Sequence, residues 1–346
     1  MAGVIALMGS GETAPGMTKV HRRLLARHDE VRAVNLDSPY GFQENVPQIT
    51  TKLIEYFATS LTTKLRALAL PSYEAASEIQ RAIVKREVRQ ATYVFAGPGS
   101  PSYALNQWRP LGLVEDLRVA LENDATLCFS SAAVLTLGSH TAPIYEVYKV
   151  GLPAHWLEGL DLLGDLGLDC AAIPHYDNAE GRNYDTRYCY LGERRLAQLE
   201  EQLPAGRAIL GVDEHTALIL DADADTVSVS GRSRGHWRVG RETLDLESGS
   251  TTPLRILRDM AGSTRRVRSP VCSPATSGEI DELARTNEPG LDPTPLIEAI
   301  LALRDVAKKG ADYTLADQLR DVLTSTGIAV HDQVDSTTWE IIEPLR

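Results

Sequence analysis

The sequence contains no long hydrophobic run of the kind that marks a membrane protein. No apolar stretch among the 346 residues approaches the roughly 18 to 20 residues that a membrane-spanning helix needs. The N-terminus has no basic start, and its apolar stretch at residues 3–9 is too short for a signal peptide. These residues instead predict a first β-strand, and we expect a cytoplasmic protein that has no membrane contact.

Cysteine and positive charge are both scarce. The cysteines lack the Cys-x-x-Cys or Cys/His spacing of a metal site, so we expect reduced, mostly buried thiols, no metal and no cofactor. The formal net charge is −12, with 35 basic against 47 acidic residues. This balance disfavours nonspecific binding to nucleic-acid phosphates, although a local basic patch is compatible with it. The cysteines are Cys128, Cys170, Cys189 and Cys272.

Short apolar runs alternate with amphipathic stretches over the first 150 residues. This alternation is typical of βαβ units, in which a parallel sheet carries helices on both faces. We therefore predict an α/β fold with a doubly wound, mostly parallel sheet, whose ligand site lies beyond the carboxyl ends of the strands. The runs lie at residues 3–9, 31–37, 65–70, 91–100 and 125–131, and the helical stretches between them at 17–28, 45–61, 72–88 and 104–123.

The rest of the chain divides into three parts. Residues 150–260 are less regular and include antiparallel strands after residue 206. Residues 262–279 are rich in Ser, Thr, Pro and Arg and predict a linker. Two amphipathic helices and a hairpin follow from about residue 292. We expect a main domain at 1–260, a linker at 261–290 and a small helical and hairpin module at 291–346.

Two adjacent serines, Ser130 and Ser131, end the fifth apolar run. A serine on a sharp turn between a strand and a helix is how several hydrolases present a nucleophile. That turn needs small residues two positions to either side, and Ser131 has Phe129 and Ala133 there. Serines that cap a helix are the simpler alternative.

Two further segments carry groups that could act together with a serine. His175 follows a predicted strand end, where it is either a catalytic base or a structural histidine. Asp213 and Glu214 precede an apolar strand, where they either orient the base or form a charged strand entry. Nucleophile, base and acid form a catalytic triad only if the fold brings them together.

Two glycine-rich loops differ in what they predict. Gly97 and Gly99 end the fourth run, and the N–H of Gly99 or Ser100, together with that of Ala132, could form an oxyanion hole. A plain tight turn is the alternative. The loop at residues 9–16 lacks the Lys-Ser/Thr of a phosphate-binding loop and the spacing of a dinucleotide fingerprint, so it does not predict nucleotide binding.

Taken together, these segments resemble the S51 peptidase family of dipeptidase E and cyanophycinase, whose domain is similar to class I glutamine amidotransferases. The resemblance runs over residues 3–244. In that family a glycine-rich loop, a Gly-x-Ser-Ala-Gly-Ala elbow, a histidine at a strand end and a Gly-x-x-Glu-x-Thr-Ala segment follow one another in this order. The last segment is the most specific match, at Gly211, Glu214, Thr216 and Ala217.

The resemblance implies a flavodoxin-like fold and a role for each matching position. Ser131 is then the nucleophile, His175 the general base and Glu214 its orienting acid. The elbow departs from the family pattern at three positions, and a bulky Phe129 is expected to strain or open it. Pro98, in the glycine loop, cannot donate an N–H. The oxyanion residues implied are Gly99, Ser100 and Ala132, and the departures in the elbow are Phe129, Ala133 and Val134.

Substrate-binding residues are harder to read from the sequence. Arg182 and Arg187 follow His175, where a guanidinium could meet an acidic substrate group or simply lie in a solvated loop. Tyr145 and Glu146 belong to a polar-tipped stretch after the elbow, which we expect to line the same cleft or a subunit contact.

Residues 311–341 resemble the C-terminal end of cysteinyl-tRNA synthetases, a region that helps to hold the tRNA anticodon stem. Residues 292–346 carry ten acidic and five basic side chains, whereas an RNA contact favours a basic surface. A packing or protein-interaction module is therefore the first expectation and tRNA contact the second. The matching residues are Ala316, Asp317, Leu319, Arg320, Asp321, Leu323, Gly327, Ile328, Asp332, Thr338 and Trp339.

The sequence thus predicts a serine hydrolase that cleaves a small peptide or an amino-acid amide. The alternative is a binding or regulatory protein with an altered or inactive site, which recognises an aminoacyl or tRNA-related partner through its C-terminal module. A homodimer is compatible with either interpretation.

Overall fold

The computed structural model describes residues 3–240 and 242–262, five single helical positions between 301 and 323, and two strands near the C-terminus. The chain forms two compact units, Met1–Ser269 and Pro270–Arg346. The linker predicted at 261–290 lies outside the described residues except for Ala261 and Gly262. The same holds for most of the two predicted C-terminal helices.

The larger unit contains the parallel sheet that the apolar runs predict. Five strands pair in parallel in the order β1-β5-β4-β2-β3, and β10, β11 and β14 extend the sheet beyond β1 in antiparallel fashion. The predicted fold class is therefore confirmed. The strands are β1 (Val4–Met8), β2 (Ala33–Leu36), β3 (Leu65–Leu68), β4 (Tyr93–Ala96), β5 (Thr126–Ser130), β10 (Thr216–Asp221), β11 (Thr226–Gly231) and β14 (Thr251–Pro253).

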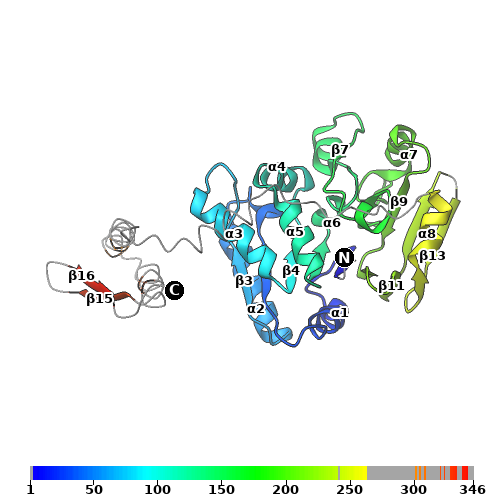
Figure 1. Ribbon diagram of the computed structural model, residues 1–346. Coiled ribbons are helices and arrows are strands. Elements are labelled where there is room, and N and C mark those ends of the chain that lie inside the picture. Colours follow the sequence, from blue (N-terminus) through cyan, green and yellow to red (C-terminus); the bar gives the residue numbers. More distant parts are fainter. Residues whose placement is uncertain are drawn as a thin grey trace, which may run out of the picture. The chain divides into compact units, whose positions relative to one another are not determined.

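Helices cover both faces of this sheet, as Figure 1 shows. Alternate side chains of β1 point to opposite faces, so Ile5 and Leu7 pack with α3, α4 and α5, whereas Ala6 and Met8 pack with α1 and α2. Because both faces are buried, β1 and β5 consist of buried residues throughout. The helices are α1 (Pro15–Leu25), α2 (Val46–Ser60), α3 (Glu78–Gln90), α4 (Pro101–Leu111) and α5 (Leu113–Glu122).

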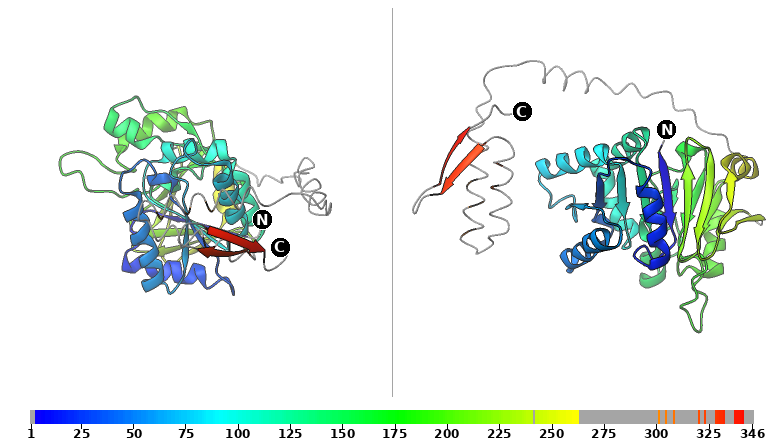
Figure 2. Two further views of the ribbon diagram at one scale, coloured as in Figure 1. Left: turned by 90° about the vertical axis from the view of Figure 1, so that its left-hand side faces the viewer. Right: turned by 90° about the horizontal axis from the view of Figure 1, so that it is seen from below.

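A second, six-stranded sheet lies beside the first, at the end of the unit that is green and yellow in Figure 2. Its order is β13-β12-β9-β8-β6-β7, and only β6, β8 and β9 run in parallel. The sequence predicted one sheet; the chain instead crosses between two sheets in the short turn from β9 to β10. The strands are β6 (His140–Thr141), β7 (Leu157–Glu158), β8 (Cys170–Ile173), β9 (Ala208–Val212), β12 (Gly235–Val239) and β13 (Glu242–Leu246).

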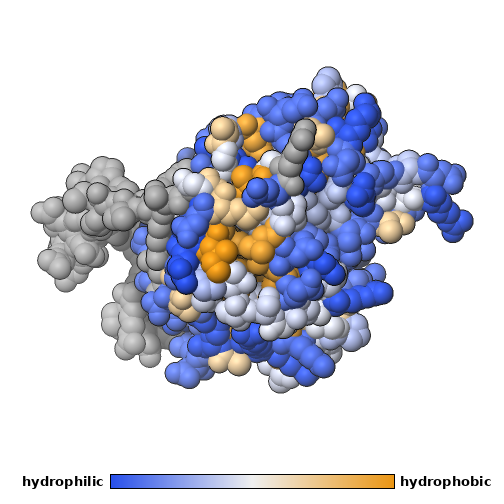
Figure 3. Space-filling view, turned by 90° about the vertical axis from the view of Figure 1, so that its right-hand side faces the viewer, coloured by the Kyte–Doolittle hydropathy of each residue, from blue (hydrophilic) through white to orange (hydrophobic). Residues whose placement is uncertain are grey.

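Several short elements complete the larger unit. The remaining helices are α6 (Ala132–Leu135), α7 (Gly192–Gln202) and α8 (Leu254–Ala261). Short helical turns lie at η1 (Ser38–Tyr40), η2 (Glu146–Val150) and η3 (Gly164–Leu166). Figure 3 shows the face on the α8 and β13 side, which is mostly hydrophilic with an apolar area at its centre. None of the helices among the described residues combines the length and apolar character needed to span a bilayer.

The smaller unit contains the predicted hairpin. Strands β15 (Ile328–Asp332) and β16 (Thr337–Ile341) pair in antiparallel fashion, with Val330 opposite Trp339.

His21 of α1 makes the stability of the larger unit depend on pH. Its ring is fully buried, Nε2 donates to the Glu12 carbonyl at 2.8 Å, and Nδ1 accepts from the Tyr93 hydroxyl at 2.7 Å. Burial lowers the pKa of His21 from 6.5 to about 4. Between these values the unfolded chain binds a proton that the folded protein does not, so the free energy of unfolding falls as the pH is lowered.

We therefore predict a loss of up to about 1.4 kcal/mol per pH unit from this residue as the pH is lowered from about 6.5 towards 4. Urea unfolding at pH 7, 6 and 5 measures it. His21→Gln takes up no proton, so its stability should fall less steeply over this range than that of the wild type. Equal slopes for the two proteins would contradict the prediction.

Candidate active site

The structure places Ser131 on a strained turn at the end of β5. Its backbone has φ 52° and ψ −122°, a conformation that a non-glycine residue rarely adopts. The Ser131 N–H donates to the Met8 carbonyl at 3.0 Å, and α6 begins at the next residue. A strained turn between strand and helix lifts the hydroxyl above the sheet edge, as a nucleophile elbow does.

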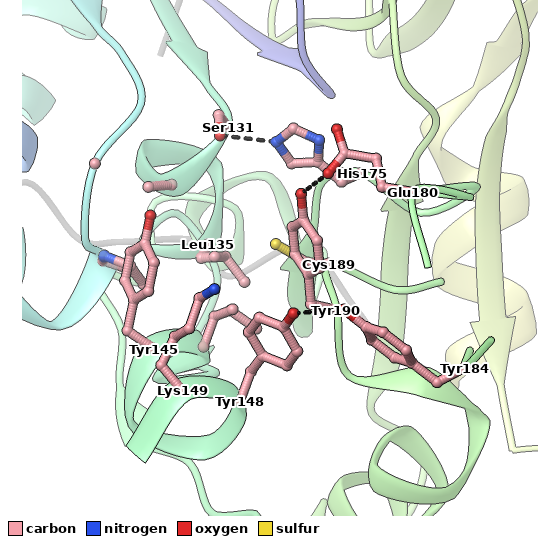
Figure 4. Close-up of a pocket in the computed structure, with 14 residues that line it drawn as sticks. Ser131, Leu135, Tyr145, Tyr148, Lys149, His175, Glu180, Tyr184, Cys189 and Tyr190 are labelled. Atoms are coloured by element: carbon pink, nitrogen blue, oxygen red, sulfur yellow. Dashed lines mark hydrogen bonds between the residues drawn. The ribbon is translucent and has the colours of Figure 1, made fainter. Parts of the chain in front are cut away.

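His175 and Glu214 meet this serine from the second sheet. Ser131 Oγ lies 2.8 Å from His175 Nε2, and His175 Nδ1 lies 2.9 Å from Glu214 Oε1. His175 follows β8, and Glu214 lies in the turn where the chain passes from β9 to β10. Figure 4 shows the Ser131–His175 bond at the rim of a pocket. The fold thus brings together the three residues that the sequence selected.

Asn178 and Asp177 hold the acid in place. The Asn178 side chain donates to Glu214 Oε1 at 3.1 Å, and the Asp177 carboxylate accepts the Glu214 N–H at 2.7 Å. The hydrogen bond from His175 lowers the pKa of Glu214, which keeps this carboxylate ionised near neutral pH. Asn178 was not predicted as a site residue from the sequence. Its position three residues after His175, in the same loop, is the feature of the sequence that could have indicated it.

The Gly-x-x-Glu-x-Thr-Ala segment has a structural reason at each position. The Tyr176 ring packs against Gly211, where an added Cβ would lie 2.5 Å from the ring. Thr216 Oγ1 donates to the Glu214 carbonyl and accepts the Ser233 N–H, which closes the turn. Ala217 is fully buried in the core beneath. The motif therefore shapes the turn that carries Glu214.

The oxyanion loop differs in part from the sequence prediction. Gly99 has φ +146°, and both it and Ala132 line the pocket beside Ser131. Among the described residues, no hydrogen bond engages the N–H of either one. The Ser100 N–H instead donates to the Pro39 carbonyl at 2.7 Å, and its hydroxyl caps α4 at Tyr103. Ser100 is therefore not an available donor, because its N–H anchors the loop from below.

Phe129 does not open the elbow, contrary to the prediction. Its ring is fully buried on the α4 face of β5, with its centroid 6.0 Å from that of Trp108. Ala133 and Val134 are also buried without a positive φ angle. Because the pleat of β5 turns Phe129 into the core, its bulk does not compete with Ser131 for the pocket.

The pocket beside the three residues has a volume of about 450 Å³ and walls of tyrosine. The Tyr148 and Tyr190 rings stack at 5.1 Å, and the Tyr148 and Tyr184 hydroxyls lie 2.8 Å apart. The Lys149 ammonium extends between Tyr145 and Tyr148 in Figure 4. Glu180 accepts a hydrogen bond from Tyr190 on the opposite wall. One cation, one carboxylate and several phenols thus surround a largely apolar floor.

One wall of the pocket is a left-handed turn. Tyr188, Cys189 and Tyr190 have φ values of 60°, 55° and 65°. Each such residue costs roughly 1–2 kcal/mol, so three in succession persist only if the surroundings hold them. The Tyr188 N–H donates to the Tyr176 carbonyl and the Cys189 N–H to the His175 carbonyl, which connects this wall to the backbone of His175.

Of the four residues that the sequence predicts to bind substrate, the structure places one in the lining of the pocket. Tyr145 lines the pocket, but Glu146 does not: its carboxylate accepts a hydrogen bond from Ser102. Arg187 is held by two hydrogen bonds to Asp185, at 2.8 and 2.9 Å, and Arg182 is exposed. Neither arginine lines the pocket.

Ser130 and Asp213, which adjoin Ser131 and Glu214 in the sequence, are bonded to other side chains and do not face His175. Ser130 Oγ is buried and donates to Glu12 at 3.0 Å. Asp213 is buried and lies 3.0 Å from His236 Nε2, whose Nδ1 lies 2.8 Å from Asp245. Burial opposes a charge on His236, but the hydrogen bonds to Asp213 and Asp245 outweigh it and raise its pKa. This cluster supports the Glu214 turn from behind.

Comparison with known proteins gives a fold neighbour for most of the chain. A crystal structure of a peptidase from an acI-B1 Actinobacterium superposes with a TM-score of 0.59 at 19% sequence identity, covering 73% of this chain and 97% of that one. At this identity the likeness shows the fold, and it confirms the predicted resemblance at that level. No family model matches the chain.

Part of the chain is similar to cysteine–tRNA ligases. The match to the ligase of Thioalkalivibrio sulfidiphilus (strain HL-EbGR7) is 28% identical over 156 residues, covering 40% of this chain and 33% of the ligase. The match to that of Acidovorax sp. (strain JS42) is 30% identical over 135 residues, covering 36% and 29%. The chain thus spans about a third of the length of these relatives. A partial match of this kind is consistent with the predicted resemblance of the C-terminal segment to the synthetases.

The Cys189 thiol lines the pocket but is predicted to be unreactive. Burial raises its pKa to about 12 from an ordinary value of 9.0, which leaves roughly a thousandfold less thiolate at pH 8. Iodoacetamide should therefore alkylate Cys189 in the folded protein far more slowly than free cysteine, as followed by peptide mass spectrometry. Alkylation at the rate of free cysteine would contradict the prediction.

Proposed function

We propose that this protein is a serine hydrolase that cleaves a small peptide or an amino-acid amide. The observation that carries the proposal is the continuous hydrogen-bonded chain from Ser131 through His175 to Glu214, with its serine at a pocket rim. The fold shared with a peptidase supports the same reaction class.

In the proposed reaction each group has one step, which the geometry supports. Ser131 Oγ attacks the carbonyl carbon while His175 Nε2 accepts its proton, and the carbonyl oxygen becomes an oxyanion. The Gly99 and Ala132 N–H groups stabilise that oxyanion. His175 then returns the proton to the leaving amine, the carbon–nitrogen bond breaks, and an acyl-enzyme remains. A water molecule, deprotonated by His175, cleaves this ester and regenerates Ser131.

Glu214 fixes which nitrogen of His175 acts as the base. Because its carboxylate can only accept a hydrogen bond, Nδ1 carries the proton and Nε2 presents its lone pair to Ser131. The lowered pKa of Glu214 keeps this arrangement in place at neutral pH. Asn178 orients the same carboxylate oxygen from the other side.

The pocket favours a small substrate. A volume of about 450 Å³ accommodates a ligand of dipeptide size rather than a folded polypeptide. The predicted arginine recognition of an acidic substrate is not supported, since Arg187 is paired with Asp185. Tyrosine rings and the Lys149 ammonium are the groups that meet the substrate side chain instead.

Covalent labelling distinguishes the proposed hydrolase from the alternative, which is a binding protein that has lost the reaction. A fluorophosphonate probe should label the wild type at Ser131, because the base–acid pair activates that hydroxyl. Ser131→Ala should abolish labelling. The matched control Ser130→Ala should retain it, since Ser130 is buried and bonded to Glu12. Absence of labelling in the wild type would instead favour the binding protein.

Glu214, which holds the His175 ring, and Asn178, which orients Glu214, should contribute unequally to the labelling rate. Glu214→Gln should slow fluorophosphonate labelling by about 10²- to 10⁴-fold, because the amide no longer enforces the tautomer or stabilises the imidazolium. Asn178→Ala removes only one of the hydrogen bonds to Glu214 and should slow labelling less. A time course of labelling, stopped at intervals and quantified on gels, measures both rates. An Asn178→Ala effect that equals or exceeds that of Glu214→Gln would contradict this order.

The tRNA contact expected of the C-terminal module stays a prediction. Similarity to cysteine–tRNA ligases supports it, and the acidic balance of residues 292–346 argues against it.

A further inference from the structure

A second groove, away from the catalytic pocket, is lined by positive charge and hydroxyl groups. It has a volume of about 700 Å³ and lies between α1, the β9–β10 turn and strands β11 and β14. Among the residues that the structure describes, no carboxylate lines it, although acidic residues outnumber basic ones in the chain. Its cationic groups are Lys19, Arg23 and Arg232, with the His215 imidazole, and its hydroxyl residues are Ser228, Ser230, Ser248, Ser250 and Thr251.

The three cations of this groove lack anionic partners. Among the described residues, no carboxylate lies within ion-pair distance of Lys19, Arg23 or Arg232, whereas most arginines of the larger unit are engaged. Arg22, next to Arg23, donates to the Ser60 carbonyl. Like charges that line one groove without a counter-charge repel one another, so a bound anion would be stabilised there.

The polar groups of the groove suit oxygen-rich anions. Serine and threonine hydroxyl groups line the groove beside the cations, and a hydroxyl can donate a hydrogen bond to a phosphate oxygen. Guanidinium groups add paired donors in a planar fork that matches phosphate. Clustered hydroxyls and arginines without any carboxylate are the donor set of a phosphate site.

We propose that this groove binds the phosphate group of a small phosphorylated molecule. The size of the groove is that of a ligand site for a nucleotide or a sugar phosphate. Arg23 and Arg232 bind the phosphate oxygens from α1 and from the turn after β11.

The groove lies on the far side of the turn that carries the catalytic acid. His215 lines the groove, and its neighbour Glu214 faces His175. The His215 N–H donates to Ser10 Oγ at 3.2 Å, and its carbonyl accepts the Arg232 N–H at 2.9 Å. Phosphate binding is thus separate from the pocket of Ser131 and does not depend on the proposed hydrolysis.

Isothermal titration of the full chain with inorganic phosphate, and then with AMP, tests the proposal. Arg23→Gln/Arg232→Gln should weaken binding of both probes at least about tenfold, since it removes two cations and their charge-assisted hydrogen bonds to the phosphate. The control Lys52→Gln/Lys64→Gln removes the same charge from exposed positions outside the groove and should leave the affinity unchanged. Lys149→Gln controls for binding in the catalytic pocket and should also have no effect.

Three results would overturn the proposal. The first is no heat of binding with millimolar phosphate or AMP. The second is an equal loss of affinity in the Lys52→Gln/Lys64→Gln control, which would mean a nonspecific charge effect. The third is binding of bulk tRNA through Arg23 and Arg232 without binding of either small probe, which would assign the groove to a nucleic-acid backbone. Unchanged melting temperatures of the variants show that a loss of binding is not a loss of folding.

Discussion

The turn from β9 to β10 is the constraint on which the candidate site depends. Here the chain leaves one sheet and enters the other within three residues, Asp213–His215. The Asp213 carbonyl lies so close to Gly9 that an added Cβ would approach it to 2.0 Å, so the first strand must carry glycine at that point. Glu214 can reach His175 because this crossing lies where the carboxyl ends of β5 and β8 meet.

Strain gathers around that crossing and is held by hydrogen bonds. Ser131, His175 and His215 all have positive φ angles, as do the three residues of the left-handed pocket wall. Each of these conformations is unfavourable alone. Backbone hydrogen bonds to a neighbouring segment hold five of the six residues, and the Tyr190 N–H donates to the Thr186 carbonyl within its own loop. The site is therefore preorganised by the rest of the fold. Other positive φ angles, such as those of Thr62 and Asp124, occur singly elsewhere, whereas strain concentrated at one site is typical of functional regions.

The alternation of apolar runs and amphipathic stretches predicted the parallel sheet, because this pattern is local. The selection of Ser131, His175 and Glu214 rested on the family resemblance, since the residues alone left simpler alternatives open for each. The sequence did not predict the second sheet, since the pattern of an apolar strand does not say which neighbour the strand will pair with. The prediction for Phe129 was also wrong, because only the pairing of β5 decides which face that ring occupies. The hydrogen bond from the Ser100 N–H to the Pro39 carbonyl and the left-handed turn at Tyr188–Tyr190 depend on contacts between distant segments. No local residue pattern predicts such contacts.

The hydrogen bond between His175 and Glu214 is the central claim, and proton NMR tests it most directly. A histidine N–H that donates to a carboxylate gives a resonance far downfield of the amide region. We expect such a signal from His175 in the wild type, and further signals from His236, whose two ring nitrogens face Asp213 and Asp245. Glu214→Gln should remove the His175 signal and leave those of His236. Persistence of every signal in Glu214→Gln, or absence of the His175 signal from the wild type, would contradict the assembly of the site across the two sheets.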